Sequence, residues 1–304
     1  MITVRVPATT ANLGPGFDCL ALALNLYNEA DFDVFPSGEG ADGSVKIDVT
    51  GEGVGVLSTG GDNLIVRAAR RLYQEAGQPF PARLAVHCRN RVPLGSGLGS
   101  SAAAIVTGLA GANALLGSPF SAGRILELAS ELEGHPDNAA AAVLGGLVLV
   151  TGGKALLARR VEMAPLDLAV VVPEFNLPTH AARAALPGQV PLADAVFNAG
   201  HAVLVVEALR SGDLELLGQV MEDRLHQPYR LKLVPGAAQA LAAARQAGAA
   251  AATLSGAGPG VIAFGRGDLS AVAAAMLAAF TTAGLPARSW LVSPSPSGVH
   301  IVGS

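Results

Sequence analysis

One loop of this 304-residue chain combines glycines and serines in a pattern suited to binding an anion. Its residues are Pro93-Leu94-Gly95-Ser96-Gly97-Leu98-Gly99-Ser100-Ser101-Ala102. Glycines at alternate positions let the backbone approach a ligand closely with its N–H groups exposed. Either serine can cap a helix that begins at Ala102, and a loop leading into a helix N-terminus favours phosphate. Because positions 92–123 carry no charged residue, we expect amide dipoles, the helix dipole and a metal ion to neutralise the phosphate.

Two common phosphate-binding motifs do not match this loop. A Walker loop requires a lysine before its Ser or Thr, and the loop contains no lysine. The dinucleotide fingerprint requires glycine at its first, third and sixth positions, and the sixth position counted from Gly95 is Ser100. The string from Val92 to Ala102 instead resembles the ATP loop of the GHMP kinases, a family that includes galactokinase and mevalonate kinase. The resemblance implies that residues 93–102 bind ATP.

A second stretch, near the start of the chain, carries information about the substrate. It reads Pro7-Ala8-Thr9-Thr10-Ala11-Asn12-Leu13-Gly14-Pro15-Gly16-Phe17-Asp18. Taken by itself, this stretch of turn residues is an ordinary loop between strands. It is also similar to the opening motif of the homoserine kinases, whereas other GHMP kinases share the position of the loop but not its amino-acid sequence. The resemblance implies that Asn12 and Asp18 face an amino-acid substrate.

The expected helix over residues 121–133 carries the candidate metal ligands. Its apolar spacing buries Ile125 and Leu128 and leaves Glu127 and Glu131 on the solvent side. The resemblance to the GHMP kinases favours Glu127 instead as the magnesium-ligating glutamate, with Glu131 and Glu133 as rivals. A hydroxyl from Ser100 or Ser101 completes the implied Mg²⁺ site, so Glu127 and Ser101 are also expected to act in catalysis.

The turn Gly134-His135-Pro136-Asp137-Asn138 follows that helix and precedes the most apolar segment of the chain. Polar groups beside such a segment are removed from water, so they need hydrogen-bond partners or a functional role. The resemblance assigns His135, Asp137 and Asn138 to the substrate. Asp137 is the natural candidate for a general base, but the same carboxylate can instead bind the substrate ammonium group, and both alternatives stay open.

The remaining candidates lie in three other places. Thr179 and Arg183 occur in one short stretch and Arg230 in another, and the two arginines resemble the pair that holds the substrate carboxylate in the family. Guanidinium groups suit that task because they form paired hydrogen bonds. Gly256 belongs to a glycine-rich stretch, 253–260, that matches the C-terminal GHMP motif lying against the phosphate loop. Asn63 is either a helix cap or a residue near the nucleotide.

The implied activity is transfer of the γ-phosphoryl group of ATP to the side-chain hydroxyl of L-homoserine, with Mg²⁺, on the route to threonine. One alternative is another GHMP kinase acting on mevalonate or an isoprenoid intermediate. The second alternative is a non-catalytic metabolite sensor on the same fold. Mevalonate and isoprenoid substrates lack an amino group, so Asp18 together with two arginines argues against them.

The composition excludes several other classes of protein. The net charge is −4 and the chain has only three lysines, so its composition does not indicate a basic surface that would bind nucleic acid or a membrane. Two cysteines are too few for a disulfide framework, and the first five residues continue into a strand pattern, not an export signal. We therefore expect a cytoplasmic enzyme with a small-molecule substrate. The resemblance also makes a homodimer a candidate assembly.

The pattern of elements indicates an α+β protein. We expect a strand at 2–6, an antiparallel meander of strands through residue 49, and a helix from Leu64 to Glu75. The second half alternates strands with helices, including helices at 193–210 and 214–225, and Trp290 is expected in the core. A boundary near 152–160 divides the chain into domains 1–155 and 156–304. The resemblance implies an N-terminal lobe like domain 2 of ribosomal protein S5 and a ferredoxin-like C-terminal lobe.

Overall fold

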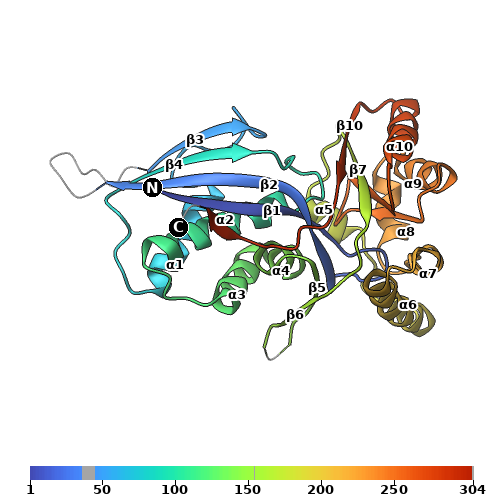
Figure 1. The fold of residues 1–304 in the computed structure, drawn as a ribbon, viewed down its shortest axis with the longest axis horizontal. Coiled ribbons are helices and arrows are strands. Elements are labelled where there is room, and N and C mark those ends of the chain that lie inside the picture. Colours follow the sequence, from blue (N-terminus) through green and yellow to red (C-terminus); the bar gives the residue numbers. More distant parts are fainter. Residues whose placement is uncertain (36–44, 154, 303–304) are drawn as a thin grey trace.

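The computed structural model describes residues 1–35, 45–153 and 155–302, and it contains two β-sheets (Figure 1). The first sheet has the strand order β11-β1-β2-β4-β3, and in addition β5 pairs with β2 and with β6. Its strands are β1 (Ile2–Ala11), β2 (Leu20–Phe35), β3 (Val45–Gly51), β4 (Arg83–Asn90), β5 (Leu147–Thr151), β6 (Leu157–Val161) and β11 (His300–Val302). The turn expected at 36–43 lies outside the described residues.

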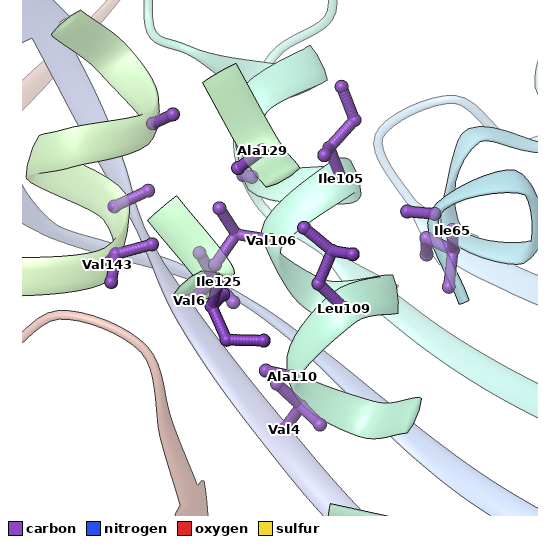
Figure 2. Close-up of a cluster of buried hydrophobic side chains, with 14 of the residues drawn as sticks. Val4, Val6, Ile65, Ile105, Val106, Leu109, Ala110, Ile125, Ala129 and Val143 are labelled. Atoms are coloured by element: carbon purple, nitrogen blue, oxygen red, sulfur yellow. The ribbon is translucent and has the colours of Figure 1, made fainter. Parts of the chain in front are cut away.

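Helices cover one side of the first sheet (Figure 1). They are α1 (Leu64–Glu75), α2 (Ser100–Leu115), α3 (Ala122–Glu133) and α4 (Asp137–Leu144). Alternate residues of β1, including Val4 and Val6, point to these helices because successive side chains of a strand face opposite ways. Figure 2 shows them packed against Val106 and Leu109 of α2. This core fixes α2, and therefore the phosphate loop that precedes it.

The second sheet, with order β10-β7-β9-β8, is entirely antiparallel and has helices on both faces. Its strands are β7 (Asp167–Pro173), β8 (Ala251–Leu254), β9 (Val261–Gly265) and β10 (Ala287–Val292). The accompanying helices are α5 (Thr179–Ala184), α6 (Leu192–Ser211), α7 (Leu214–Val220), α8 (Gln227–Arg230), α9 (Ala237–Gln246) and α10 (Ser270–Thr282), with a 3₁₀ turn at Leu231–Leu233. Together the two lobes give the expected α+β architecture.

One hydrophobic cluster joins the two lobes. Leu168 and Val170 of β7 pack in it together with Leu13 and Leu20, which flank the first loop. The cluster also takes in Val205 of α6, a helix that is long and apolar enough in composition to span a membrane. Such a helix is weak support for a membrane protein, because the core helix of a globular protein passes the same criterion.

Several expectations about the elements are corrected. The expected antiparallel meander is wrong at β3, which pairs parallel with β4, while β4 lies between β2 and β3. Alternation of apolar residues marks a strand but does not specify its neighbour. The strand expected at 2–6 continues to Ala11, and the helix expected at 214–225 ends at Val220. Trp290 is only partly buried.

The division into domains 1–155 and 156–304 stays a prediction, and the pairing of two later strands bears on where its boundary lies. Strands β6 and β11 follow that position in sequence, yet both belong to the first sheet. We propose that the boundary lies between β6 and β7 and that the C-terminal strand returns to the first lobe. Strand β11 pairs with β1, so the last described residues brace the strand that leads into the first loop.

Candidate functional site

A cleft of about 490 Å³ is lined by residues from both lobes. Its lining includes nearly all of the residues expected to bind nucleotide or substrate: Asn12, Asp18, Asn63, Leu94, Gly95, Ser96, Gly97, Gly99, Ser100, Ser101, His135, Asp137, Asn138, Thr179, Arg183, Arg230 and Gly256. Four expected site residues do not line it: Pro93, Leu98, Ala102 and Glu127. Residues far apart in the sequence are therefore brought to one place.

The phosphate loop has the backbone geometry that its glycines predict. Gly95, Gly97 and Gly99 have φ values of 59°, 78° and 67°, in the left-handed region that glycine adopts without steric cost. The expectation of a serine cap is wrong, because Gly99 is the N-cap of α2 and no side chain caps the helix. The first N–H groups of a helix have no intrahelical partner, so the start of α2 remains available to an anion.

The glycine-rich stretch of the second lobe packs directly on the phosphate loop, which confirms the expected contact. The Ser255 hydroxyl donates to the Gly97 carbonyl at 2.8 Å, and the Gly260 N–H donates to the Ser96 carbonyl at 3.1 Å. Gly256 connects this glycine-rich stretch to the first loop, since its carbonyl accepts a hydrogen bond from Asn12 Nδ2 at 2.8 Å. The shape of the phosphate loop therefore depends on both lobes.

This packing predicts a difference between two glycines of one loop. A Cβ on Gly97 would collide with the backbone carbonyl of Ser255, whereas a Cβ on Gly95 would meet no atom within 4 Å. Both positions carry the strain of a positive φ, but only Gly97→Ala must also displace backbone, an overpacking cost of about 1–3 kcal/mol. We expect Gly97→Ala to bind a non-hydrolysable ATP analogue about tenfold more weakly than Gly95→Ala in calorimetric titrations. Equal affinities would contradict this account.

The start of α1 also lines the cleft. Asn63 is the N-cap of that helix, because its Oδ1 accepts from the Ile65 N–H at 2.9 Å. Its Nδ2 donates to the Ser58 carbonyl at 2.6 Å, and both residues line the cleft together with Leu57. The capping interpretation is confirmed, and the position of Asn63 in the cleft also agrees with a place near the nucleotide.

Of the three candidate glutamates of α3, the one that lines the cleft is Glu133, the last residue of the helix, and its carboxylate accepts a hydrogen bond from the Ser101 hydroxyl. Glu127, which the family resemblance favoured, instead pairs with Arg124 at 2.7 Å and is exposed. Glu131 lies on the same outer face, where it contacts Arg71 and Arg124. The position of Glu127 is corrected: apolar periodicity placed it correctly on the solvent side.

The turn before α4 forms a hydrogen-bonded cluster in the cleft. Asp137 is buried, and its Oδ1 accepts from the Asn138 N–H at 2.7 Å and lies 3.1 Å from His135 Nδ1. The hydrogen bond to Asp137 raises the pKa of His135 above its ordinary value, which favours the protonated ring. Thr9 donates to Asn138 Oδ1 at 2.8 Å and so ties the turn to β1. Oδ2 of Asp137 accepts no hydrogen bond from the described residues.

Arg183 and Asp18 form a two-bonded ion pair across the lobes. Nη1 and Nη2 of the arginine donate to the two carboxylate oxygens at 2.8 and 2.9 Å. The hydrogen bond to Asp18 raises the pKa of Arg183. Both side chains are partly exposed to solvent in the cleft, so water or a ligand can compete for the pair.

Arg230 has a different environment, because it is only 2% exposed and yet lines the cleft. Its Nε donates to the Ala182 carbonyl at 3.3 Å, and its Cζ lies 5.1 Å from the centre of the Phe17 ring. Among the described residues no carboxylate forms an ion pair with it. Burial and the neighbouring Arg183 lower its pKa, although a guanidinium keeps its charge in proteins. A buried cation without a carboxylate partner is suited to binding an anionic ligand.

Sequence reasoning missed two residues of this region. Phe17 is part of the quoted first loop, but its contact with both arginines appears only in the structure, where Arg183 Cζ lies 5.5 Å and Arg230 Cζ 5.1 Å from the ring centre. His226 precedes Arg230 by one helical turn and contacts it, and nothing in the sequence assigned it a partner. A cation near an aromatic ring is a common contact, but spacing along the chain does not reveal it.

Comparison with known families matches both halves of the chain. Residues 63–146 match the family described as "GHMP kinases N terminal domain", and residues 205–282 match "GHMP kinases C terminal". The first match contains the phosphate loop and the turn before α4. The second contains Arg230 and the glycine-rich stretch.

Individual relatives resemble the chain over its whole length. Homoserine kinase of Moorella thermoacetica is 47% identical and is covered over 100% of its length, with 99% of this chain aligned. Homoserine kinase of a Synechococcus species is 45% identical, with 99% of this chain and 97% of the relative covered. The crystal structure of homoserine kinase from Cytophaga hutchinsonii superposes with a TM-score of 0.88 at 30% identity, covering 99% of this chain and 97% of that one.

Proposed function

The chain belongs to the homoserine kinases of the GHMP kinase family, and on this premise we propose that its cleft transfers the γ-phosphoryl group of ATP to the side-chain hydroxyl of L-homoserine. One observation carries the proposal. A single cleft joins an open phosphate loop to a pocket containing the carboxylate of Asp18 and the guanidinium groups of Arg183 and Arg230. A zwitterionic amino acid needs both signs of charge, and an acceptor without an amino group does not.

The phosphate end of the cleft binds and orients ATP. The N–H groups at the start of α2 and the loop amides from Gly95 to Ser101 supply dipoles, and the loop has no cationic side chain. Phosphoryl transfer mainly requires that the reacting groups are aligned and that the charge of the phosphates is neutralised. The contact of Ser255 with Gly97 holds the loop in shape for that role.

The acidic and hydroxyl groups near the loop fit a magnesium ion. We propose Glu133 and Ser101 as its protein ligands in place of Glu127, with Ser100 as the neighbouring hydroxyl. Mg²⁺ prefers oxygen ligands and is commonly held by one or two carboxylates together with substrate phosphates. Among the described residues, no group of three or more His, Cys, Asp or Glu side chains could hold a metal ion. When bound, Mg²⁺ neutralises phosphate charge.

The acceptor end of the cleft orients the amino acid. Arg183 and Arg230 bind the carboxylate, and Asp18 and Asn12 bind the ammonium group. The zwitterion then replaces the ion pair between Asp18 and Arg183, and each of the two side chains exchanges its present partner for the opposite charge of the substrate. His135, Asn138, Thr179 and Gly256 line the same region and complete the proposed substrate site.

Asp137 is proposed as the general base. Asp18 provides a carboxylate for the ammonium group, which leaves Asp137 for the hydroxyl. The buried Asp137 is held by Asn138 and His135 through Oδ1, and Oδ2 is available to accept the proton of the attacking hydroxyl. A fixed carboxylate in this position favours the reactive orientation of the acceptor.

An acceptor panel tests the proposed function. ADP release is measured with the intact chain, ATP and Mg²⁺ in the presence of homoserine, mevalonate or galactose. We expect turnover with homoserine to exceed turnover with the other two acceptors. Faster ADP release with mevalonate or galactose would overturn the assignment, and no acceptor-dependent release would favour a sensor. A cytoplasmic location, a homodimer and the absence of nucleic-acid and membrane partners stay predictions.

The two arginines give a further prediction. Arg183→Ala and Arg230→Ala each remove charge-assisted hydrogen bonds worth about 1.5–3 kcal/mol, so the KM for homoserine should rise about ten- to a hundredfold. The KM for ATP should change far less, because the arginines lie at the acceptor end. Arg224→Ala is the matched control, since Arg224 pairs with Asp194 and does not line the cleft. Steady-state kinetics that show equal effects on both KM values would contradict this placement.

A further inference from the structure

The neighbour that orients Arg230 is itself a titratable side chain. His226 is fully buried, and its Nδ1 lies 3.3 Å from Nη1 of Arg230. A guanidinium can only donate, so Nδ1 must be the acceptor. We propose that His226, as the neutral tautomer with a bare Nδ1, is the positioning residue that holds the Arg230 guanidinium in place for the substrate carboxylate. This inference rests on the proposed function and adds to it a specificity-determining residue.

The backbone of the first loop fixes the tautomer of His226. Its Nε2 lies 2.8 Å from the carbonyl oxygen of Gly14, and a carbonyl can only accept. Nε2 must therefore carry the proton and donate it, which leaves Nδ1 as a lone-pair acceptor in the neutral ring. The ring also stacks on Phe17, with 5.3 Å between the ring centres and 27° between the planes. The imidazole is thus fixed in position and in tautomer by the first loop.

A buried carboxylate near the same ring nitrogen fixes the backbone at His226, since Oδ2 of Asp223 lies 3.5 Å from Nε2. Asp223 accepts from the N–H groups of His226 and Gln227 at 3.0 and 2.6 Å, and Asn198 Nδ2 donates to it at 2.7 Å. Asn198 also donates to the Pro15 carbonyl at 3.1 Å. Asp223 therefore sets the start of α8, the short helix that carries Arg230, and links it to the same first loop.

The electrostatic surroundings favour the neutral ring. Burial, first of all, lowers the pKa of His226, and the charge of Arg230 acts in the same direction, while Asp223, the Gly14 carbonyl and Asp18 oppose it. A protonated ring would lose the acceptor at Nδ1 and would place a second positive charge against Arg230. The neutral form is therefore the one compatible with the contacts of this cluster.

Two amide substitutions test the contributions of the two ring nitrogens separately. The amide oxygen of asparagine can take the place of Nδ1, whereas the amide nitrogen of glutamine reaches the place of Nε2. His226→Gln keeps a donor for Gly14 and loses the acceptor for Arg230. His226→Asn does the reverse. If His226 only supports the fold, the two variants lose activity and thermal stability together.

We expect His226→Gln to raise the KM for homoserine about tenfold, the effect of losing one hydrogen bond to a charged group. The kcat and the KM for ATP should stay near those of the parent, and His226→Asn should keep most of the affinity for homoserine. The preference for homoserine over its analogue with the carboxylate reduced to an alcohol should fall in His226→Gln alone. Equal losses in both variants, or an unchanged KM in His226→Gln, would overturn the proposal.

A measurement on the unsubstituted protein keeps the proposal testable if a variant fails to fold. Nitrogen-15 NMR of histidine-labelled protein near neutral pH should show a protonated Nε2 and an unprotonated Nδ1 for His226. Its ring is identified by a nuclear Overhauser effect to Phe17. A proton on Nδ1 would overturn the proposal. Lack of homoserine phosphorylation by the parent chain would instead count against the proposed function, because the NMR result does not depend on activity.

Discussion

Replacing Asp137 by asparagine should lower kcat by about a hundredfold or more, because a positioned general base contributes about 10²- to 10⁴-fold. Asparagine fills nearly the same volume and can keep the contact with the Asn138 N–H, so the turn before α4 should stay folded. What is lost is the second carboxylate oxygen, Oδ2, the proposed proton acceptor. Steady-state kinetics with homoserine and saturating ATP measure the effect directly.

Asp18→Asn is the matched control for this change. Asp18 is the other carboxylate at the acceptor end of the cleft, and we assign it to the ammonium group. Its loss should raise the KM for homoserine with a smaller effect on kcat. If Asp137→Asn instead raises the KM and leaves kcat intact, Asp137 binds the ammonium group and the transfer proceeds without a carboxylate base.

Replacing Glu133 by glutamine should also reduce turnover by about 10²- to 10³-fold, the size of effect seen when one preorganised charge-stabilising group is removed. The phosphate loop contains no cationic side chain, so a metal ion is the main source of positive charge there. Glutamine retains the size of the side chain and a partner for Ser101, but it is a poorer ligand for Mg²⁺. The concentration of Mg²⁺ needed for half-maximal activity should rise in parallel.

Glu127→Gln gives the control on the same helix. Glu127 lies on the outer face of α3, where it pairs with Arg124, so its loss should leave turnover and Mg²⁺ dependence near those of the parent. The reverse result, with Glu127→Gln inactive and Glu133→Gln normal, would restore the family-based choice. It would also require α3 to be rotated relative to its position in this structure.

Local sequence signals predicted much of the fold. Asn63 marks the start of α1 because its side chain can accept from an N–H of the first turn, and the helix ends at Glu75 as expected. The alternating glycines predicted a loop whose backbone can approach a ligand, and three of them have the positive φ values that glycine tolerates. These features depend on residues a few positions apart, so the sequence alone contains them.

Features that depend on distant partners were not predictable in the same way. The parallel pairing of β3 with β4 follows from the connection through α1, and apolar alternation does not reveal it. Asp18 and Arg183 were each expected to face the substrate, but their pairing across 165 positions appears only in the folded chain. The role inferred for His226 depends on which ring nitrogen meets Gly14, which is a property of geometry and not of residue type.

The different positions of the three glutamates of α3 have a physical explanation. Glu127 and Glu131 are one helical turn apart and share a face, whereas Glu133 lies nearly opposite Glu131 on the helix. Helical periodicity therefore predicted the exposed pair correctly, and the resemblance to other kinases favoured Glu127, which does not line the cleft. The contact between Glu133 and Ser101 brings together the end of α3 and the start of α2.

The most direct test of the central claim is to identify the phosphorylated product. Phosphorus-31 NMR follows the intact chain with ATP, Mg²⁺ and L-homoserine, and ADP is quantified in the same sample. We predict that O-phospho-L-homoserine appears in equal amount to ADP, with no build-up of inorganic phosphate. ADP that appears with inorganic phosphate alone, at a rate that does not depend on homoserine, would contradict the claim that this cleft phosphorylates homoserine.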